Sequence, residues 1–224
     1  MTSESDEYGH SSGAIPEPRY RRSGCGIRYD EDQLREGIDF SAASSLRDTG
    51  GTTLDFRAAT RDDAADIAAL VNRAYRGEES RKGWTTEADL LGGQRIDTAL
   101  ILELMESSFF RLAYDGESLV GSMQIEVLDA HTAELGMLAV APERQDQGIG
   151  RQMLDEGEAF IRDQLELDGI RMRVLHQREP LLRWYERNGY QRTGATSPFP
   201  KSPRFGEPRV DDLWFVVLEK SLSS

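Results

Sequence analysis

Cysteine is almost absent from this chain of 224 residues, and histidine is rare. Cys25 stands alone, so no disulfide can form within the chain, and a reducing compartment fits. His10, His131 and His176 are far apart in the sequence, so their spacing indicates no metal site. No apolar run approaches the roughly 18 residues of a membrane span, and the N-terminus lacks the apolar core of a signal peptide. These absences predict a cytoplasmic protein without disulfide, metal or membrane segment.

Basic residues are also fewer than acidic ones, with 27 Lys and Arg against 40 Asp and Glu and a formal net charge of −13. This balance argues against a nucleic-acid partner, because neutralising phosphates requires clustered Lys and Arg. An acidic chain would tolerate a cationic ligand, although a solvated acidic surface explains the charge equally well.

The first 50 residues are poor in apolar side chains and rich in Ser, Gly and charge, which predicts a mobile extension over 1–50 and a folded domain over 51–224. Residues 198–208 hold four of the eight prolines and predict an ordered loop rather than sheet. The other patterns predict strands at 53–58, 109–114, 119–127, 132–140, 170–175, 190–193 and 213–218, with helices after Thr60, at 87–91, from Asp97, after Gly150 and from Pro180. This order predicts an α/β fold with a mixed, mostly antiparallel central sheet of about six to seven strands and helices on both faces.

A glycine-rich turn links the apolar strand at 132–140 to the longest predicted helix, and it carries Gln145, Gly148 and Gly150. The first amides of a helix have no intrahelical partner, and glycines let a ligand approach them, so this turn predicts an anion site suited to phosphate. Arg151 follows Gly150 where a nucleotide-hydrolysing loop needs Lys. Met153 stands where a dinucleotide fingerprint needs a third glycine.

The remaining pattern, Gln-x-x-Gly-x-Gly directly after an apolar strand, resembles the coenzyme A pyrophosphate loop of the GNAT superfamily of N-acetyltransferases. The resemblance covers residues 53 to about 220, because the GNAT fold has the predicted order of elements. It implies acetyl-CoA as co-substrate and no metal. The resemblance places the pantetheine arm and pyrophosphate on Leu138, Ala139, Val140, Gln145, Asp146, Gln147, Gly148, Ile149, Gly150 and Arg151.

Two side chains are predicted to carry the chemistry. A primary amine with a pKa of about 10.4 must lose a proton before it attacks a thioester, so a base is needed. Glu134 stands on the 132–140 strand where several GNAT enzymes carry their catalytic Glu, although an ordinary surface Glu fits that position too. Tyr185 stands where the family's tyrosine hydrogen-bonds the leaving sulfur. The family's Asn after the preceding strand is missing, and His176 and Gln177 occupy that region.

The resemblance predicts an N-acetyltransferase that transfers acetyl directly to the amine of a small molecule. Trp84, Phe199 and Phe205 are expected to wall the acceptor side, although Trp84 could instead plug an edge of the core. The alternatives are a non-catalytic CoA-binding regulatory module and a protein or peptide N-acetyltransferase. Homodimers are common in the family, and no stretch of this sequence indicates an interface.

Overall fold

A computed structural model describes residues 44–45 and 54–223. Eight of the described strands form one sheet, in which only the pair β6–β7 is parallel. In spatial order they are β1 (Ser44–Ser45), β2 (Asp55–Ala58), β4 (Phe109–Asp115), β5 (Ser118–Val127), β6 (Thr132–Val140), β7 (Gly169–Leu175), β10 (Trp214–Ser221) and β8 (Gln191–Pro198). The predicted mixed, mostly antiparallel sheet is therefore confirmed.

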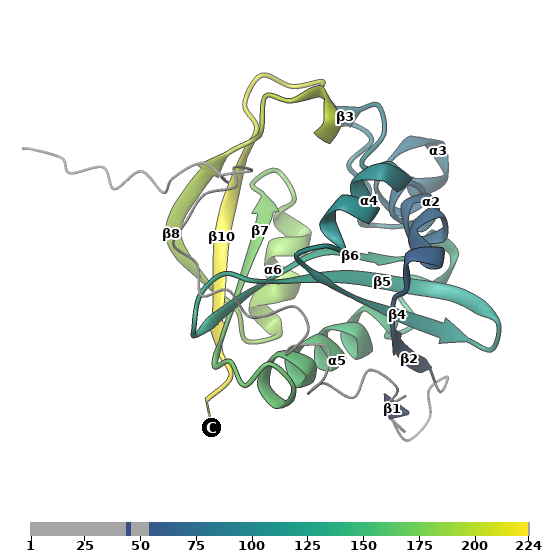
Figure 1. Ribbon diagram of the computed structural model, residues 1–224. Helices are drawn as coiled ribbons and strands as arrows, with labels where there is room; N and C mark the ends of the chain where they lie inside the picture. The colour runs from purple at the N-terminus through teal and green to yellow at the C-terminus, as the bar shows by residue number, and fades with distance from the viewer. Residues whose placement is uncertain (1–43, 46–53, 224) are drawn as a thin grey trace, which may run out of the picture.

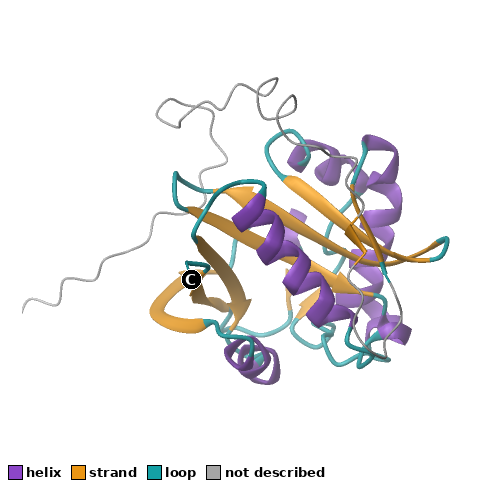
Figure 2. Cartoon of the chain, turned by 90° about the horizontal axis from the view of Figure 1, so that it is seen from below, coloured by secondary structure: helices purple, strands orange, loops and turns teal. Residues whose placement is uncertain are grey.

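Helices cover both faces of this sheet, as the order of elements predicted (Figure 1). They are η1 (Arg61–Asp63), α2 (Ala64–Tyr75), α3 (Gly77–Ser80), α4 (Thr98–Leu104), η2 (Pro142–Arg144), α5 (Ile149–Asp163), α6 (Glu179–Arg187) and η3 (Pro203–Phe205). Helices α2 and α4 pack with Phe110 and Leu112 of β4 in one apolar cluster. Helix α5 packs with Met123 and Leu135 in the other. Figure 2 shows the long helix α5 lying across the strands.

Close approach of α5 to the sheet depends on a small residue in the middle of its buried face. A Cβ atom at Gly157 would lie 2.8 Å from Leu135 Cδ1 and 2.9 Å from Met123 Sδ. Met153, Leu154, Phe160 and Ile161 surround that glycine on the same buried face. The helical spacing of apolar residues after Gly150 thus positions the helix whose N-terminus carries the glycine-rich turn.

The sheet divides between β6 and β7. These strands pair only through Thr132–Glu134 and Gly169–Arg171, and beyond that point they separate (Figure 1). On its other side β6 stays paired with β5, with a register shift next to Met137, whose φ is 45°. The bulged half of β6 therefore faces a gap in the sheet, where its backbone and side chains are open to a ligand.

Two local predictions were wrong. The segment 87–91 does not form a helix, since Leu91–Gly92 is the short strand β3 and pairs with β9 (Glu207–Pro208). That pairing also brings part of the proline-rich stretch 198–208 into a two-stranded sheet, which a proline tolerates at an edge. The predicted extension 1–50 lies outside the described residues except for Ser44–Ser45, which pairs with β2. None of the described helices is long and apolar enough to cross a membrane.

Candidate active site

The glycine-rich turn begins α5 with free amide groups. Gly148 caps the helix with φ 79°, a left-handed conformation that favours glycine. The amides of Arg151 and Gln152 both donate to the Gly148 carbonyl oxygen, at 3.1 Å each. The amides of Ile149 and Gly150 precede these first intrahelical bonds and lie at the positive end of the helix dipole. The turn can therefore bind an anionic group through its backbone.

A cavity of about 110 Å³, here called the loop cavity, extends from this turn along β6 to α6. It brings together nine of the predicted site residues from three separate stretches of the chain. These are Trp84, Leu138, Val140, Gln145, Asp146, Gly148, Gly150, Arg151 and Tyr185. The other three predicted loop and strand residues do not line it, since Ala139 and Ile149 are buried in the core and Gln147 is exposed.

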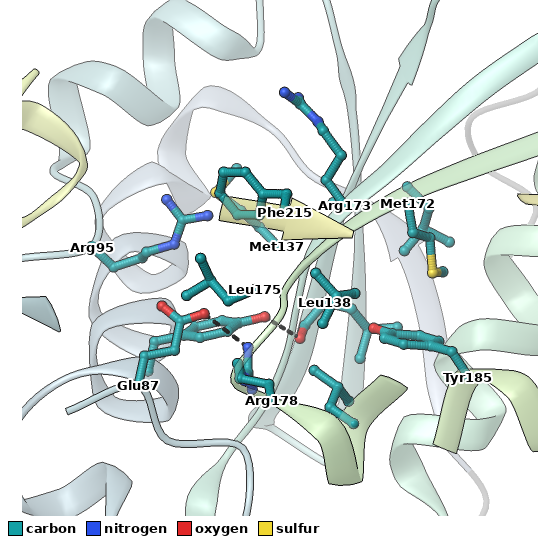
Figure 3. A pocket seen from close by; sticks show the side chains of 15 residues that line it. Glu87, Arg95, Met137, Leu138, Met172, Arg173, Leu175, Arg178, Tyr185 and Phe215 are labelled. Carbon is teal, nitrogen blue, oxygen red and sulfur yellow. Dashed lines mark hydrogen bonds and ion pairs between the residues drawn. The ribbon is translucent and has the colours of Figure 1, made fainter. Parts of the chain in front are cut away.

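A second cavity, here called the strand cavity, occupies the gap between β6 and β7 (Figure 3). Its walls include Gly136 and Met137 of β6, Arg173 and Leu175 of β7, and Phe215 of β10. Five residues line both cavities: Tyr75, Leu138, Arg178, Leu181 and Tyr185. The two cavities therefore adjoin at these side chains.

Tyr185 presents a protonated hydroxyl at this junction. Its side chain is buried, and burial together with the nearby Tyr75 raises the pKa of its hydroxyl well above the ordinary value. The phenol therefore keeps its proton at neutral pH and can donate a hydrogen bond to a group bound beside it. Tyr75 itself donates to the Leu138 carbonyl oxygen at 2.7 Å, which fixes its ring at the same junction.

Comparison with known proteins supplies the family. Residues 106–192 match the model of the Acetyltransferase (GNAT) domain. This part of the chain is a GNAT acetyltransferase domain. A mycothiol acetyltransferase from Tsukamurella paurometabola is 30% identical over 156 residues, which cover 68% of this chain and 52% of that protein. The chain thus spans about half the length of this curated relative.

Solved structures share the fold of the GNAT domain. A spermidine/spermine N-acetyltransferase from Vibrio cholerae has a TM-score of 0.54 and 18% identity, covering 76% of this chain and 93% of its own. The ribosomal-protein-S18-alanine N-acetyltransferase from Escherichia coli has a TM-score of 0.57 and 13% identity, covering 76% of this chain and 95% of its own. One of these proteins is named for polyamines and the other for a protein, so the shared fold leaves the acceptor open.

The predicted base of the GNAT domain, Glu134, is paired with an arginine. Arg173 donates to its carboxylate, with Nε at 2.8 Å from Oε1, and Arg173 rather than Glu134 lines the strand cavity. Glu126 lies directly opposite Glu134 on β5. Burial and the charge of Glu134 raise the pKa of Glu126. Glu126 was not predicted as a site residue. The predicted pairing of strands 119–127 and 132–140 could have indicated it, because that pairing places a second carboxylate near Glu134.

The three predicted acceptor-side aromatics do not come together. Trp84 lines the loop cavity, where its ring centroid lies 6.3 Å from that of Trp184. The ring centroid of Phe199 lies 5.7 Å from that of Phe215, and Phe215 rather than Phe199 lines the strand cavity. Phe205 packs against the cluster of α2 and α4. Their acceptor-binding role stays a prediction, and the position of Trp84 favours contact with a ligand of the glycine-rich turn.

Gln145 of the GNAT domain uses its side chain to hold the segment 83–85. Its Oε1 accepts from the Trp84 amide at 2.9 Å, and its Nε2 donates to Thr85 Oγ1 at 2.9 Å and to the Val140 carbonyl oxygen at 3.2 Å. A Cβ atom at Gly83 would lie only 2.5 Å from Gln145 Oε1, so this contact requires glycine there. The side chain thus connects the glycine-rich turn to the wall that carries Trp84.

A buried ion cluster that the sequence analysis missed stands beside both cavities. Glu87 accepts from Arg76 and, at 2.8 Å, from Nη1 of Arg178. All three side chains are less than 10% exposed. Arg178 also donates to the Thr85 carbonyl oxygen and lines both cavities. It follows the strand β7, near the place where the family's Asn was expected. His176, also in that region, instead stacks on Trp214 at 4.1 Å.

Proposed function

We propose that this chain is an acetyl-CoA-dependent N-acetyltransferase whose acceptor is the amine of a small molecule. The GNAT domain and the acetyltransferase relatives support N-acetyltransferase activity. The observation that carries the proposal is the junction of the two cavities. The glycine-rich turn opens into one cavity, a second cavity adjoins it, and Tyr185 lies in the wall of both.

The residues around the loop cavity fit coenzyme A. The amides of Ile149 and Gly150 would bind its pyrophosphate, and the edge of β6 at Leu138 and Val140 would bind its pantetheine arm as an added strand. Tyr75 and Gln145 already donate to those two carbonyl oxygens, and each oxygen has a second lone pair. When bound, acetyl-CoA supplies an acetyl group activated as a thioester.

The transfer forms an amide C–N bond and breaks the thioester C–S bond. The acceptor's ammonium group loses two protons in all, of which one ends on the sulfur and one is released to solvent. Glu134 would take a proton through water, because Arg173 stands between its carboxylate and the strand cavity. Tyr185 would donate a proton to the leaving sulfur and regain one from solvent.

A small acceptor is favoured by the way the acceptor side is closed. The pairing of β3 with β9 joins the segment after Glu87 to the proline-rich segment. Arg209 strengthens this connection, with its amide 2.9 Å from the Leu90 carbonyl oxygen and its Nη1 2.7 Å from the Ala88 carbonyl oxygen. These bonds hold together two segments that would have to part to admit an extended peptide.

The test is calorimetric titration of acetyl-CoA followed by a thiol-release assay with small amines and peptides. Gly148→Glu should abolish binding, because it places a carboxylate at the anion site. Gly194→Glu is a matched control, since both glycines have φ near 80° and open space around a Cβ atom, and Gly194 lies away from both cavities. The control should bind like the parent.

Each other outcome supports a different conclusion. Binding without thiol release from any acceptor would favour a non-catalytic CoA-binding module. Release with peptides alone would favour a protein N-acetyltransferase. Absence of binding by the parent would overturn the cofactor and with it the proposed activity.

A further inference from the structure

Basic side chains outnumber acidic ones in the lining of the strand cavity, although the chain as a whole is strongly acidic. Arg95, Arg173 and Arg178 line the cavity, and Glu87 is the one carboxylate among its lining residues in the described part of the chain. Arg173 is paired with Glu134, which lies behind it. The cavity therefore reverses the sign of the chain's net charge of −13. Such a local reversal favours a ligand with a negative group.

The carboxylate of Glu87 is already shared. Arg76 and Arg178 both bond to it. Burial, followed by the charges of Arg95 and Arg178, lowers the pKa of Arg76, although Glu87 acts in the opposite direction. One buried carboxylate thus offsets only part of the charge of the guanidinium groups around it. Buried charge without a counter-ion is costly, so a further anion at this place would be stabilised.

Arg95 lies near Glu87, whose pKa its charge helps to lower, but the salt bridges of Glu87 in the described part of the chain go to Arg76 and Arg178. The Arg95 Cζ atom lies 5.9 Å from the centroid of the Tyr75 ring, and within residues 44–45 and 54–223 Arg95 forms no salt bridge. Its backbone amide donates to Asn72 Oδ1 at 2.7 Å, which holds the residue in place. The backbone of Arg95 is therefore fixed, and its guanidinium stands at the cavity wall near the Tyr75 ring, where a ligand can reach it. Its planar fork suits the two oxygens of a carboxylate.

The arrangement also orients such a ligand. Figure 3 shows Arg95 and Tyr185 on opposite sides of the strand cavity, with Leu138 between them. Tyr185 marks the junction with the loop cavity, where the acetyl group would be delivered under the proposed function. An acceptor with a carboxylate at Arg95 would direct its other end, the amine, toward that junction. The cavity's volume of about 60 Å³ suits a short molecule.

We propose that the acceptor is a small amine that also carries a carboxylate, as an amino acid does, and that Arg95 binds this carboxylate. The inference rests on the proposed function and specifies its substrate class. In this arrangement the Arg95 guanidinium contacts the carboxylate of the bound acceptor directly. The preference should appear mainly in the KM of the acceptor, because the carboxylate is bound equally before and during the reaction.

The experiment compares a panel of amino acids with their carboxamides in the thiol-release assay, for the parent, Arg95→Ala and Arg162→Ala. The parent should favour the carboxylates by about 10- to 100-fold in kcat/KM, the range of one charge-assisted hydrogen-bonded contact. Arg95→Ala should lose that preference through a raised KM. Arg162 is an exposed arginine on α5 paired with Asp163, and its removal should preserve the preference.

A second measurement covers the case in which the panel lacks the true acceptor. Thermal unfolding of the protein is measured in the presence of CoA and one of two further compounds. These are N-acetylglycine, which carries a carboxylate, and N-acetylglycinamide, which carries a carboxamide instead. The carboxylate should stabilise the parent and the Arg162→Ala variant but not Arg95→Ala. Equal use of carboxamides, a preference retained in Arg95→Ala, or no stabilisation by the carboxylate would each overturn the inference. Acetyl-CoA binding by the parent, with turnover of carboxamides, would leave the proposed function standing.

Discussion

Replacing Glu87 with glutamine should destabilise the protein far more than its single charge suggests. The substitution keeps the side-chain volume but leaves the guanidinium groups of Arg76 and Arg178 buried without their carboxylate. Removing one partner of a buried ion pair costs about 3–5 kcal/mol. At about 2–4 °C per kcal/mol for a domain of this size, the melting temperature should fall by about 6–20 °C.

Thermal unfolding followed by circular dichroism measures this loss. Glu103→Gln is the matched control, because Glu103 and Arg204 form an ion pair at 3.0 Å with both side chains 52% exposed. Such a surface pair contributes about 0–1 kcal/mol. Adding Arg76→Met to Glu87→Gln should restore part of the stability, since it removes one uncompensated cation. The reasoning is refuted if Glu87→Gln unfolds within a degree or two of Glu103→Gln.

Three further predictions concern single side chains. Tyr185→Phe should lower kcat about 100-fold while calorimetry shows unchanged acetyl-CoA affinity; a wild-type kcat would remove the residue from proton transfer. Arg57 holds the pKa of Asp63 at about 2, below the unfolded value, so this carboxylate stabilises the fold above about pH 4, and the effect is lost as pH falls toward 2. Asp63→Asn should therefore flatten the dependence of unfolding free energy on pH between about 4 and 2. The effect is at most about 2 kcal/mol, because solvent screens the pair where Arg57 is 41% exposed, and an unchanged acid limb of the denaturation curve would contradict this. Gly157→Ala should cost about 1–3 kcal/mol in urea unfolding, because its Cβ would overlap Leu135, and a neutral effect would show that α5 can shift outward.

The regular elements were predictable because each depends on a short local pattern. Residues 132–140 form an apolar stretch before the glycine-rich turn, and the structure has β6 over the same residues. Asp97 was expected to begin a helix, and its side chain accepts from the Leu100 amide at 2.7 Å. Gly148 was identified from its place before the helix, and its φ of 79° explains why glycine stands there.

The surroundings of the two cavities were not predictable, because their contacts join distant parts of the chain. Glu87 and Arg178 are 91 residues apart, and no periodic pattern relates them. Trp84 lies near Trp184, one hundred positions later, which placed it at the loop cavity instead of among the acceptor-side aromatics. The bulge at Met137 depends on pairing with β5, so the sequence of β6 alone carries no signal for it.

The side-chain bonds of Gln145 have a consequence for exchanging segments between relatives. The segment 83–85 is fastened at Gln145 to the glycine-rich turn and at Arg178 to the start of α6. A foreign segment grafted in its place would still offer its backbone carbonyl to Arg178, but it would need glycine at position 83 and a hydrogen-bonding side chain at position 85 to keep its full attachment to Gln145. Under the proposed acceptor site, substituting Arg95 would therefore be a simpler way to change the acceptor preference than exchanging the segment 83–85.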